Sequence, residues 1–111
     1  MKIFPDFLDD KTPDEEFNKA PDFVDEIPTS DSIRAVGGAS LTTVVAEDQD
    51  GTDVSSSMVL SKAVSGTTLK AHLKMPAGEN TYLVTYTAQM TNSAEVFKKY
   101  QIVKVRTPKA I

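Results

Sequence analysis

A ten-residue run of alternating apolar and polar side chains, residues 81–90, constrains this chain more than any other feature of its sequence. The apolar side chains on one face of the run are Tyr82, Val84, Tyr86, Ala88 and Met90. Alternation with a period of two, in a segment rich in Tyr, Val and Thr, predicts a half-buried antiparallel β-strand. We therefore expect one face of this strand to pack against a core.

Other strand-like segments precede and follow this run, and turn signals separate them. They are residues 40–47, 57–61, 68–74 and 97–106. In 68–74 the predicted inward side chains are Leu69, Ala71 and Leu73. Asp50-Gly51 is a strong hairpin signal, and Ser65-Gly66-Thr67 marks another turn. Strands spaced by about 8–12 residues predict an all-β fold, a two-layer antiparallel sandwich or a small barrel.

The last predicted strand does not keep a single alternation. Tyr100 and Ile102 share one parity, whereas Val103 and Val105 share the other. A change of face within one strand predicts a β-bulge or register shift near Ile102.

Composition and charge exclude several classes of protein. The 111 residues include no cysteine and no apolar run of about 18 residues, so we expect a cytoplasmically made chain with no disulfide and no membrane span. Residues 1–32 hold ten acids and three lysines, and residues 33–111 hold six acids and nine bases. An acidic segment on a mildly basic body argues against binding to nucleic acid phosphates.

The first 32 residues predict an extended arm attached to a sandwich of residues 33–111. Four of the six prolines lie in the first 28 residues, which prevents a long helix or an interior strand. A short helix over residues 13–19 is expected, because Thr12 can cap it, Pro13 suits its first position and Glu15 has the capping-box spacing.

A repeat within the arm predicts its function. Residues 5–10 and 21–26 match in class at all six positions, and each copy places an aromatic and an aliphatic residue among acids. The candidate partner-docking side chains are Phe4, Phe7, Leu8, Phe17, Phe23 and Val24. In one hypothesis they enter pockets on a partner. In the other, they fold back onto the chain's own sandwich and cover an edge strand.

The sequence offers no catalytic, cofactor or metal set. His72, the only histidine, falls on the outward side of its strand between two lysines and has neither cysteine nor a second histidine beside it. The acids of residues 47–53 lack the spacing of a calcium loop, so a solvated turn is the default, with a non-EF-hand cation site as the alternative. We expect a protein that is not an enzyme and has no cofactor.

Three segments together resemble a known family. They are residues 65–69, the run Gly78-x-x-x-Tyr82-x-Val84-Thr85, and residues 100–106. Across residues 38–107 the chain resembles the small immunoglobulin-like structural proteins of tailed bacteriophages, some of which act as neck, tail or fibre adaptors. The resemblance implies an immunoglobulin-like sandwich in a virion, with other virion proteins as partners.

The leading functional expectation is thus a non-enzymatic virion component that joins neck, tail or fibre subunits. The opposite charges of residues 1–32 and 33–111 also allow one copy's arm to lie on the next copy's body, which would build a homo-oligomeric ring. The alternative is a carbohydrate- or receptor-binding immunoglobulin-like module. It is less favoured because the chain has no tryptophan and only three tyrosines.

Overall fold

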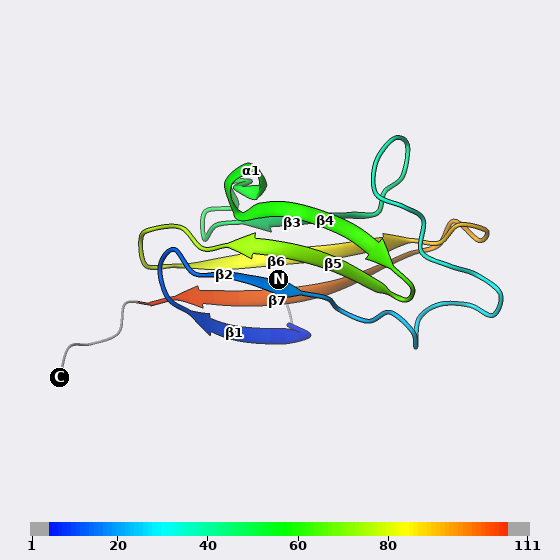
Figure 1. The fold of residues 1–111 in the computed structure, drawn as a ribbon, viewed down its shortest axis with the longest axis horizontal. Coiled ribbons are helices and arrows are strands. Elements are labelled where there is room, and N and C mark those ends of the chain that lie inside the picture. Colours follow the sequence, from blue (N-terminus) through cyan, green and yellow to red (C-terminus); the bar gives the residue numbers. More distant parts are fainter. Residues whose placement is uncertain (1–4, 107–111) are drawn as a thin grey trace.

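Seven β-strands and one short helix form the part of the chain, residues 5–106, that the computed structural model describes (Figure 1). In chain order they are β1 (Phe7–Lys11), β2 (Glu16–Lys19), β3 (Thr43–Glu47), α1 (Ser55–Met58), β4 (Val59–Ser65), β5 (Thr68–Lys74), β6 (Asn80–Gln89) and β7 (Val96–Val105). The predicted all-β fold class is confirmed. Within these residues no helix is long and apolar enough to cross a membrane.

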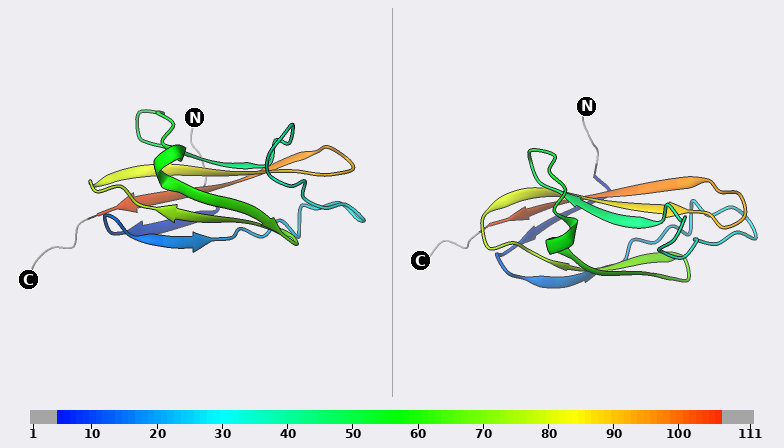
Figure 2. Two further views of the ribbon diagram at one scale, coloured as in Figure 1. Left: turned by 45° about the horizontal axis from the view of Figure 1, so that its top comes forward. Right: turned by 90° about the horizontal axis from the view of Figure 1, so that it is seen from above.

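The strands form two sheets that pack as two layers (Figure 2). One sheet has the order β1-β7-β6-β3, and the other has the order β2-β5-β4. All neighbouring strands are antiparallel except β1 and β7, which run parallel. The predicted β-sandwich is therefore confirmed, and its first and last strands lie side by side.

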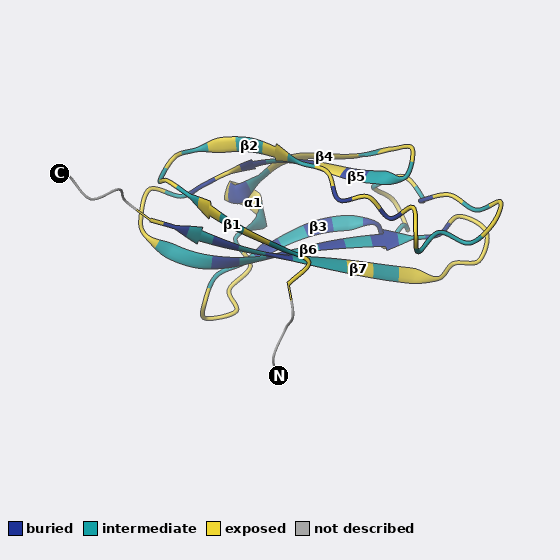
Figure 3. Cartoon of the chain, turned by 90° about the horizontal axis from the view of Figure 1, so that it is seen from below, coloured by how far each residue is buried: buried dark blue, intermediate teal, exposed yellow. Residues whose placement is uncertain are grey.

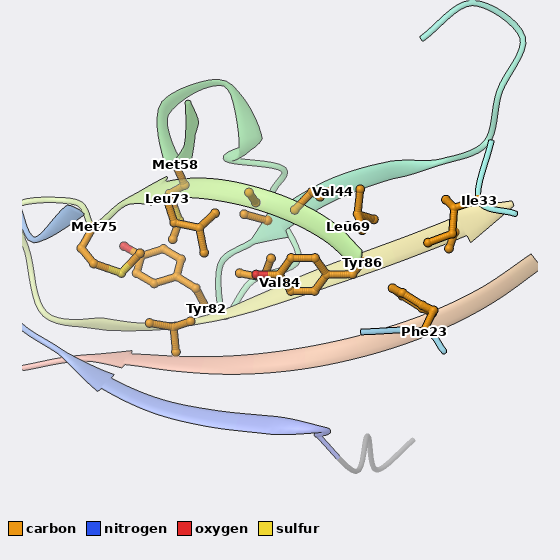
Figure 4. Packing of buried hydrophobic residues seen from close by; sticks show 14 of the residues in the cluster. Phe23, Ile33, Val44, Met58, Leu69, Leu73, Met75, Tyr82, Val84 and Tyr86 are labelled. Carbon is orange, nitrogen blue, oxygen red and sulfur yellow. The ribbon is translucent and has the colours of Figure 1, made fainter. Parts of the chain in front are cut away.

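The core lies between the sheets, where the apolar faces of β5 and β6 meet. The eight side chains predicted to be inward in residues 68–74 and 81–90 are all buried: Leu69, Ala71, Leu73, Tyr82, Val84, Tyr86, Ala88 and Met90. Figure 4 shows Leu69 and Leu73 across from the aromatic rings of β6, with Met58 and Met75 filling the space at one end. Alternating burial along β6 is also visible in Figure 3, so the period of two in the sequence does mark a half-buried strand.

The connection between β3 and β4 differs from the predicted hairpin. The turn forms, since an Asp48 carboxylate oxygen accepts hydrogen bonds from the backbone N–H groups of Asp50 (2.9 Å) and Thr52 (3.0 Å). However, β3 and β4 belong to different sheets, so the chain crosses between layers after the turn. Helix α1 makes this crossing and takes up the start of the predicted strand 57–61.

The predicted bulge near Ile102 is wrong. β7 pairs with β6 in one register over its ten residues, from Val96 opposite Gln89 to Val105 opposite Asn80. The inward residues of β7 include Gln101, so a polar side chain interrupts the apolar pattern without any change of face. The register shift among the described strands lies instead in β4, between Val59 and Ser61.

The predicted division into an arm and a body is also wrong. β1 joins the four-stranded sheet and β2 joins the three-stranded sheet, so residues 7–19 are part of the sandwich. No helix forms at 13–19. The capping-box pair is nevertheless present, because Glu15 Oε1 accepts a hydrogen bond from the Thr12 backbone N–H at 3.1 Å. Asp14 follows with a φ of 62°, which turns the chain back as a strand instead of continuing a helix.

Candidate functional site

The structure separates the six predicted docking residues into different environments. Phe4 lies outside the described residues. Phe23 is fully buried, and Phe7 and Phe17 are half-buried and turned towards the interior of the sandwich. Leu8 and Val24 are exposed, at 63% and 54%. The hypothesis that the segment folds back onto its own sandwich therefore describes Phe7, Phe17 and Phe23, and a docking role stays a prediction for Phe4, Leu8 and Val24.

Two reciprocal contacts hold β1 against β2. The Lys11 ammonium lies 4.1 Å from the ring centroid of Phe17, and the Lys19 ammonium lies 4.4 Å from that of Phe7. Lys19 Nζ is also 3.3 Å from Asp9 Oδ2. These side chains project inward from the two edge strands, so cation–π pairs and an ion pair close this side of the sandwich where an apolar contact would be usual.

A buried hydrogen-bond network continues from Asp9 into the core. The Tyr86 hydroxyl donates to Gln101 Oε1 at 2.7 Å, and Gln101 Nε2 donates to Asp9 Oδ2 at 2.6 Å. Burial, reinforced by the nearby Asp9 carboxylate, raises the pKa of the Tyr86 hydroxyl above its usual range, which keeps it protonated as a donor. The network thus links β6, β7 and β1 through one fully buried glutamine.

The second copy of the sequence repeat has a different structural role. The Phe23 backbone N–H donates to the Thr67 carbonyl at 2.8 Å, and its ring enters the core beside β6 (Figure 4). Lys99 Nζ lies 5.4 Å from the centroid of this ring and 3.3 Å from Glu26 Oε1. The similar residues of the two copies therefore serve two separate parts of the sandwich.

Asp31 fixes the loop that follows this second copy. Its carboxylate accepts hydrogen bonds from the backbone N–H groups of Asn92 (2.9 Å), Ser93 (3.0 Å) and Ser32 (2.8 Å). These bonds, first that of Asn92, hold the pKa of the Asp31 carboxyl well below its usual range. The loop before β3 is thereby attached to the β6–β7 turn.

The outer face of the three-stranded sheet is polar. His72 lies on this face as predicted, and its ring nitrogens are 2.9 Å from Asn18 Oδ1 and 2.9 Å from Glu16 Oε1, both on β2. Its neighbours on the strand, Lys70 and Lys74, are exposed. The histidine therefore bridges two adjacent strands.

The acidic turn is occupied by its own hydrogen bonds. Asp53 Oδ1 accepts from the Ser55 hydroxyl at 2.6 Å and from the Ser55 backbone N–H at 2.9 Å, while Asp48 holds the turn as described above. Across residues 5–106 no three histidine, cysteine or acidic side chains gather in a way that could hold a metal ion. A non-EF-hand cation site in this turn is thus not supported by the arrangement of its carboxylates.

The outer face of the four-stranded sheet is apolar at its centre. In the register of the sheet, Leu8 lies beside Ile102, which lies beside Leu83. In the next row, Tyr100 lies beside Thr85, and Thr85 lies beside Val45. We call the set Leu8, Val45, Leu83, Tyr100 and Ile102 the apolar face. All five point away from the core, and none of them is fully buried.

Charged side chains surround the apolar face. Lys98 and Lys104 project from β7 on either side of it, and Asp10 and Glu47 lie on the two edge strands. Asp10 and Lys104 are neighbours in the register. An apolar centre with a charged rim is the usual composition of a protein–protein contact. Sequence alternation identified β6, but this face depends on β1 and β7, whose pairing could not be read from the sequence.

Comparison with known proteins gives no relative from which a function could be transferred. No family model matches the sequence, and a comparison with curated proteins finds no match. The apolar face therefore has to be interpreted from its own residues.

Proposed function

We propose that this chain is a non-enzymatic structural component of a tailed-bacteriophage virion, made in the host cytoplasm. In this proposal it joins neck, tail or fibre subunits through protein–protein contacts. The observation that carries the joining role is the contrast between the two outer faces of the sandwich. One face presents Lys70, His72 and Lys74 to solvent, and the other presents the apolar face. The virion setting rests on the resemblance of residues 38–107 to phage structural proteins.

The strand order supports an immunoglobulin-like fold within this proposal. Immunoglobulin constant-type domains place their second, fifth and fourth strands in one sheet and their third, sixth and seventh in the other. The sheets β2-β5-β4 and β7-β6-β3 have this arrangement. The first strand differs, since β1 lies beside β7 and not beside β2. A sandwich of this kind can serve as a rigid support for a binding surface.

The apolar face can supply binding energy that the polar face cannot. Covering a large aliphatic side chain removes it from water and contributes about 1.5–3 kcal/mol when burial is complete. Leu8 has the most to gain because it is 63% exposed, and Ile102 and Leu83 are already partly covered by their neighbours. The lysines and acids of the rim then orient the partner and exclude poorly matched surfaces.

Sugar or receptor recognition through aromatic stacking is not favoured by the positions of the aromatic side chains. Tyr82 and Tyr86 are in the core, and Phe7 and Phe17 are covered by lysines. Of the aromatic residues in the described part of the chain, Tyr100 is the one that faces outward on a sheet. A carbohydrate platform needs several such rings.

The test is incorporation into phage particles when the chain's gene is replaced by variants. Ile102→Glu places a charge at the centre of the apolar face, and Ala63→Glu adds the same charge to the exposed outer face of the other sheet. We expect Ile102→Glu to reduce the copies per particle at least tenfold, with Ala63→Glu close to the unmodified chain. Circular dichroism checks that both variants fold. Normal incorporation of a folded Ile102→Glu chain would refute the role of the apolar face, and absence of the unmodified chain from particles would refute the virion role.

A further inference from the structure

We infer that β1 is an exchangeable strand, which in the assembled protein pairs with β7 of a second copy of the same chain. Three features lie together here. β1 is at the edge of its sheet, its connection to β2 is short and strained, and β7 offers a specific site for it. It concerns the edge of the sheet and does not depend on the apolar face or on the virion setting. It would supply a route to the homo-oligomeric ring expected from the sequence.

β1 is weakly held by its own sandwich. It is an edge strand of five residues, and none of them is fully buried. Its pairing with β7 is parallel, which is slightly less stable for each residue than antiparallel pairing. Its contacts with the interior are made by Phe7, Asp9 and Lys11, two of which are charged. β1 itself therefore contributes a single apolar side chain, Phe7, to the interior.

The connection between β1 and β2 is short and strained. It consists of residues 12–15 and contains Pro13, followed by Asp14 in the left-handed region with a φ of 62°. Aspartate adopts that region more readily than most residues, but glycine adopts it with less strain. Straightening this connection would relieve Asp14 and send β1 away from its own body. Short hinges under strain are the sites at which domain swapping arises.

The site that β1 leaves is selective for an identical strand. Gln101 Nε2 and Lys19 Nζ both point at Asp9 Oδ2, at 2.6 and 3.3 Å. Without Asp9, the fully buried Gln101 would lose the acceptor of its amide, which is costly for a buried group. An incoming strand must therefore carry a hydrogen-bond acceptor at this position, and a carboxylate also pairs with the Lys19 ammonium.

The same strand must satisfy two further side chains. On β1, Phe7 lies two residues before Asp9 and Lys11 lies two residues after it. The Lys19 ammonium lies over the ring of Phe7, and the Lys11 ammonium lies over the ring of Phe17. A second copy of this chain supplies all three groups in the correct order. It also brings its own Leu8, which restores the apolar face.

One hinge variant and one matched control variant test the inference on the full-length chain. Asp14→Gly removes the backbone strain of the hinge, and Ala94→Gly makes the same change at another left-handed residue, with a φ of 59°, in the β6–β7 turn. Light scattering coupled to size-exclusion chromatography measures the oligomer fraction over a range of concentrations. We expect oligomers of the unmodified chain, a severalfold lower oligomer fraction for Asp14→Gly, and no change for Ala94→Gly.

A cysteine experiment identifies the strand that is exchanged. The chain has no cysteine, so Leu8→Cys and Ile102→Cys can be placed on separate copies, which are unfolded together, refolded and oxidised. These positions are register neighbours on β1 and β7, whereas Leu83 lies one strand further away. We expect disulfide-linked dimers of Leu8→Cys with Ile102→Cys, and at least fivefold fewer with Leu83→Cys.

Two results would overturn the inference. One is an unmodified chain that is monomeric at every concentration. The other is equal cross-linking to Ile102→Cys and Leu83→Cys. Ile102→Glu can block incorporation into particles while Leu8→Cys fails to cross-link preferentially to Ile102→Cys. In that case the strand exchange is wrong and the proposed function stands.

Discussion

The buried contact between Tyr86 and Gln101 predicts a specific non-additivity in stability. Tyr86→Phe removes the hydroxyl that donates to Gln101 Oε1 at 2.7 Å and leaves a fully buried acceptor without a donor. Such a group costs about 1–3 kcal/mol. Gln101→Met has a similar cost, because the buried Tyr86 hydroxyl then has no acceptor. In the double variant both polar groups are absent, so the penalty for an unpaired buried group disappears.

The remaining loss in the double variant is the bond from Gln101 to Asp9, whose side chain is partly exposed and keeps Lys19 as a partner. We therefore expect the double variant to be more stable than the sum of the single variants by about 1–2 kcal/mol. Urea unfolding measures the four free energies of the cycle. For a chain of this size about 1 kcal/mol corresponds to a shift of roughly 4–8 °C in Tm. An interaction energy below about 0.5 kcal/mol would show that the two side chains act independently and that this reasoning is wrong.

Further predictions concern the core and the response to pH. Phe23→Ala should lower the free energy of unfolding by about 3–5 kcal/mol in urea titrations, because the ring is fully buried, whereas exposed Val24→Ala should change it by less than about 0.5 kcal/mol. The Asp31 carboxyl has a lower pKa in the folded state than in the unfolded state, so it stabilises the fold above the unfolded pKa of about 3.9. Thermal melts should show this contribution lost as the pH falls through the folded pKa, and Asp31→Asn should reduce that dependence on pH.

The sequence predicts the centre of the sandwich because each central strand has one uniformly apolar face. In β5 and β6 every inward position carries an apolar side chain, so the period of two is complete. The edges could not be predicted in the same way. β1 and β2 place Asp9, Lys11 and Lys19 at inward positions, and these charges hide the alternation. Their stabilising partners lie on the opposite strand, which a local pattern cannot reveal.

Two local signals were correct in chemistry and misleading in structure. Thr12 and Glu15 form the side-chain contact of a capping box, but it stabilises a turn between strands. The change of parity after Ile102 was interpreted as a bulge, whereas the strand is regular and its inward Gln101 is satisfied by Tyr86 and Asp9. The apolar face was missed for a related reason, because it is assembled from four strands that are separated in the sequence. Phe23 was assigned to docking because sequence shows apolar character but not which surface an aromatic ring covers.

The parallel pairing of β1 and β7 determines how the molecule responds to mechanical force. β1 begins beside the middle of β7, and both strands run in the same direction towards residue 106. Pulling the two ends of the described chain apart moves β1 and β7 in opposite directions along their own axes. The load is then shared by all the hydrogen bonds between the two strands, which must break together and not one after another. A subunit held at both ends would therefore resist extension through an edge strand that has no fully buried residue.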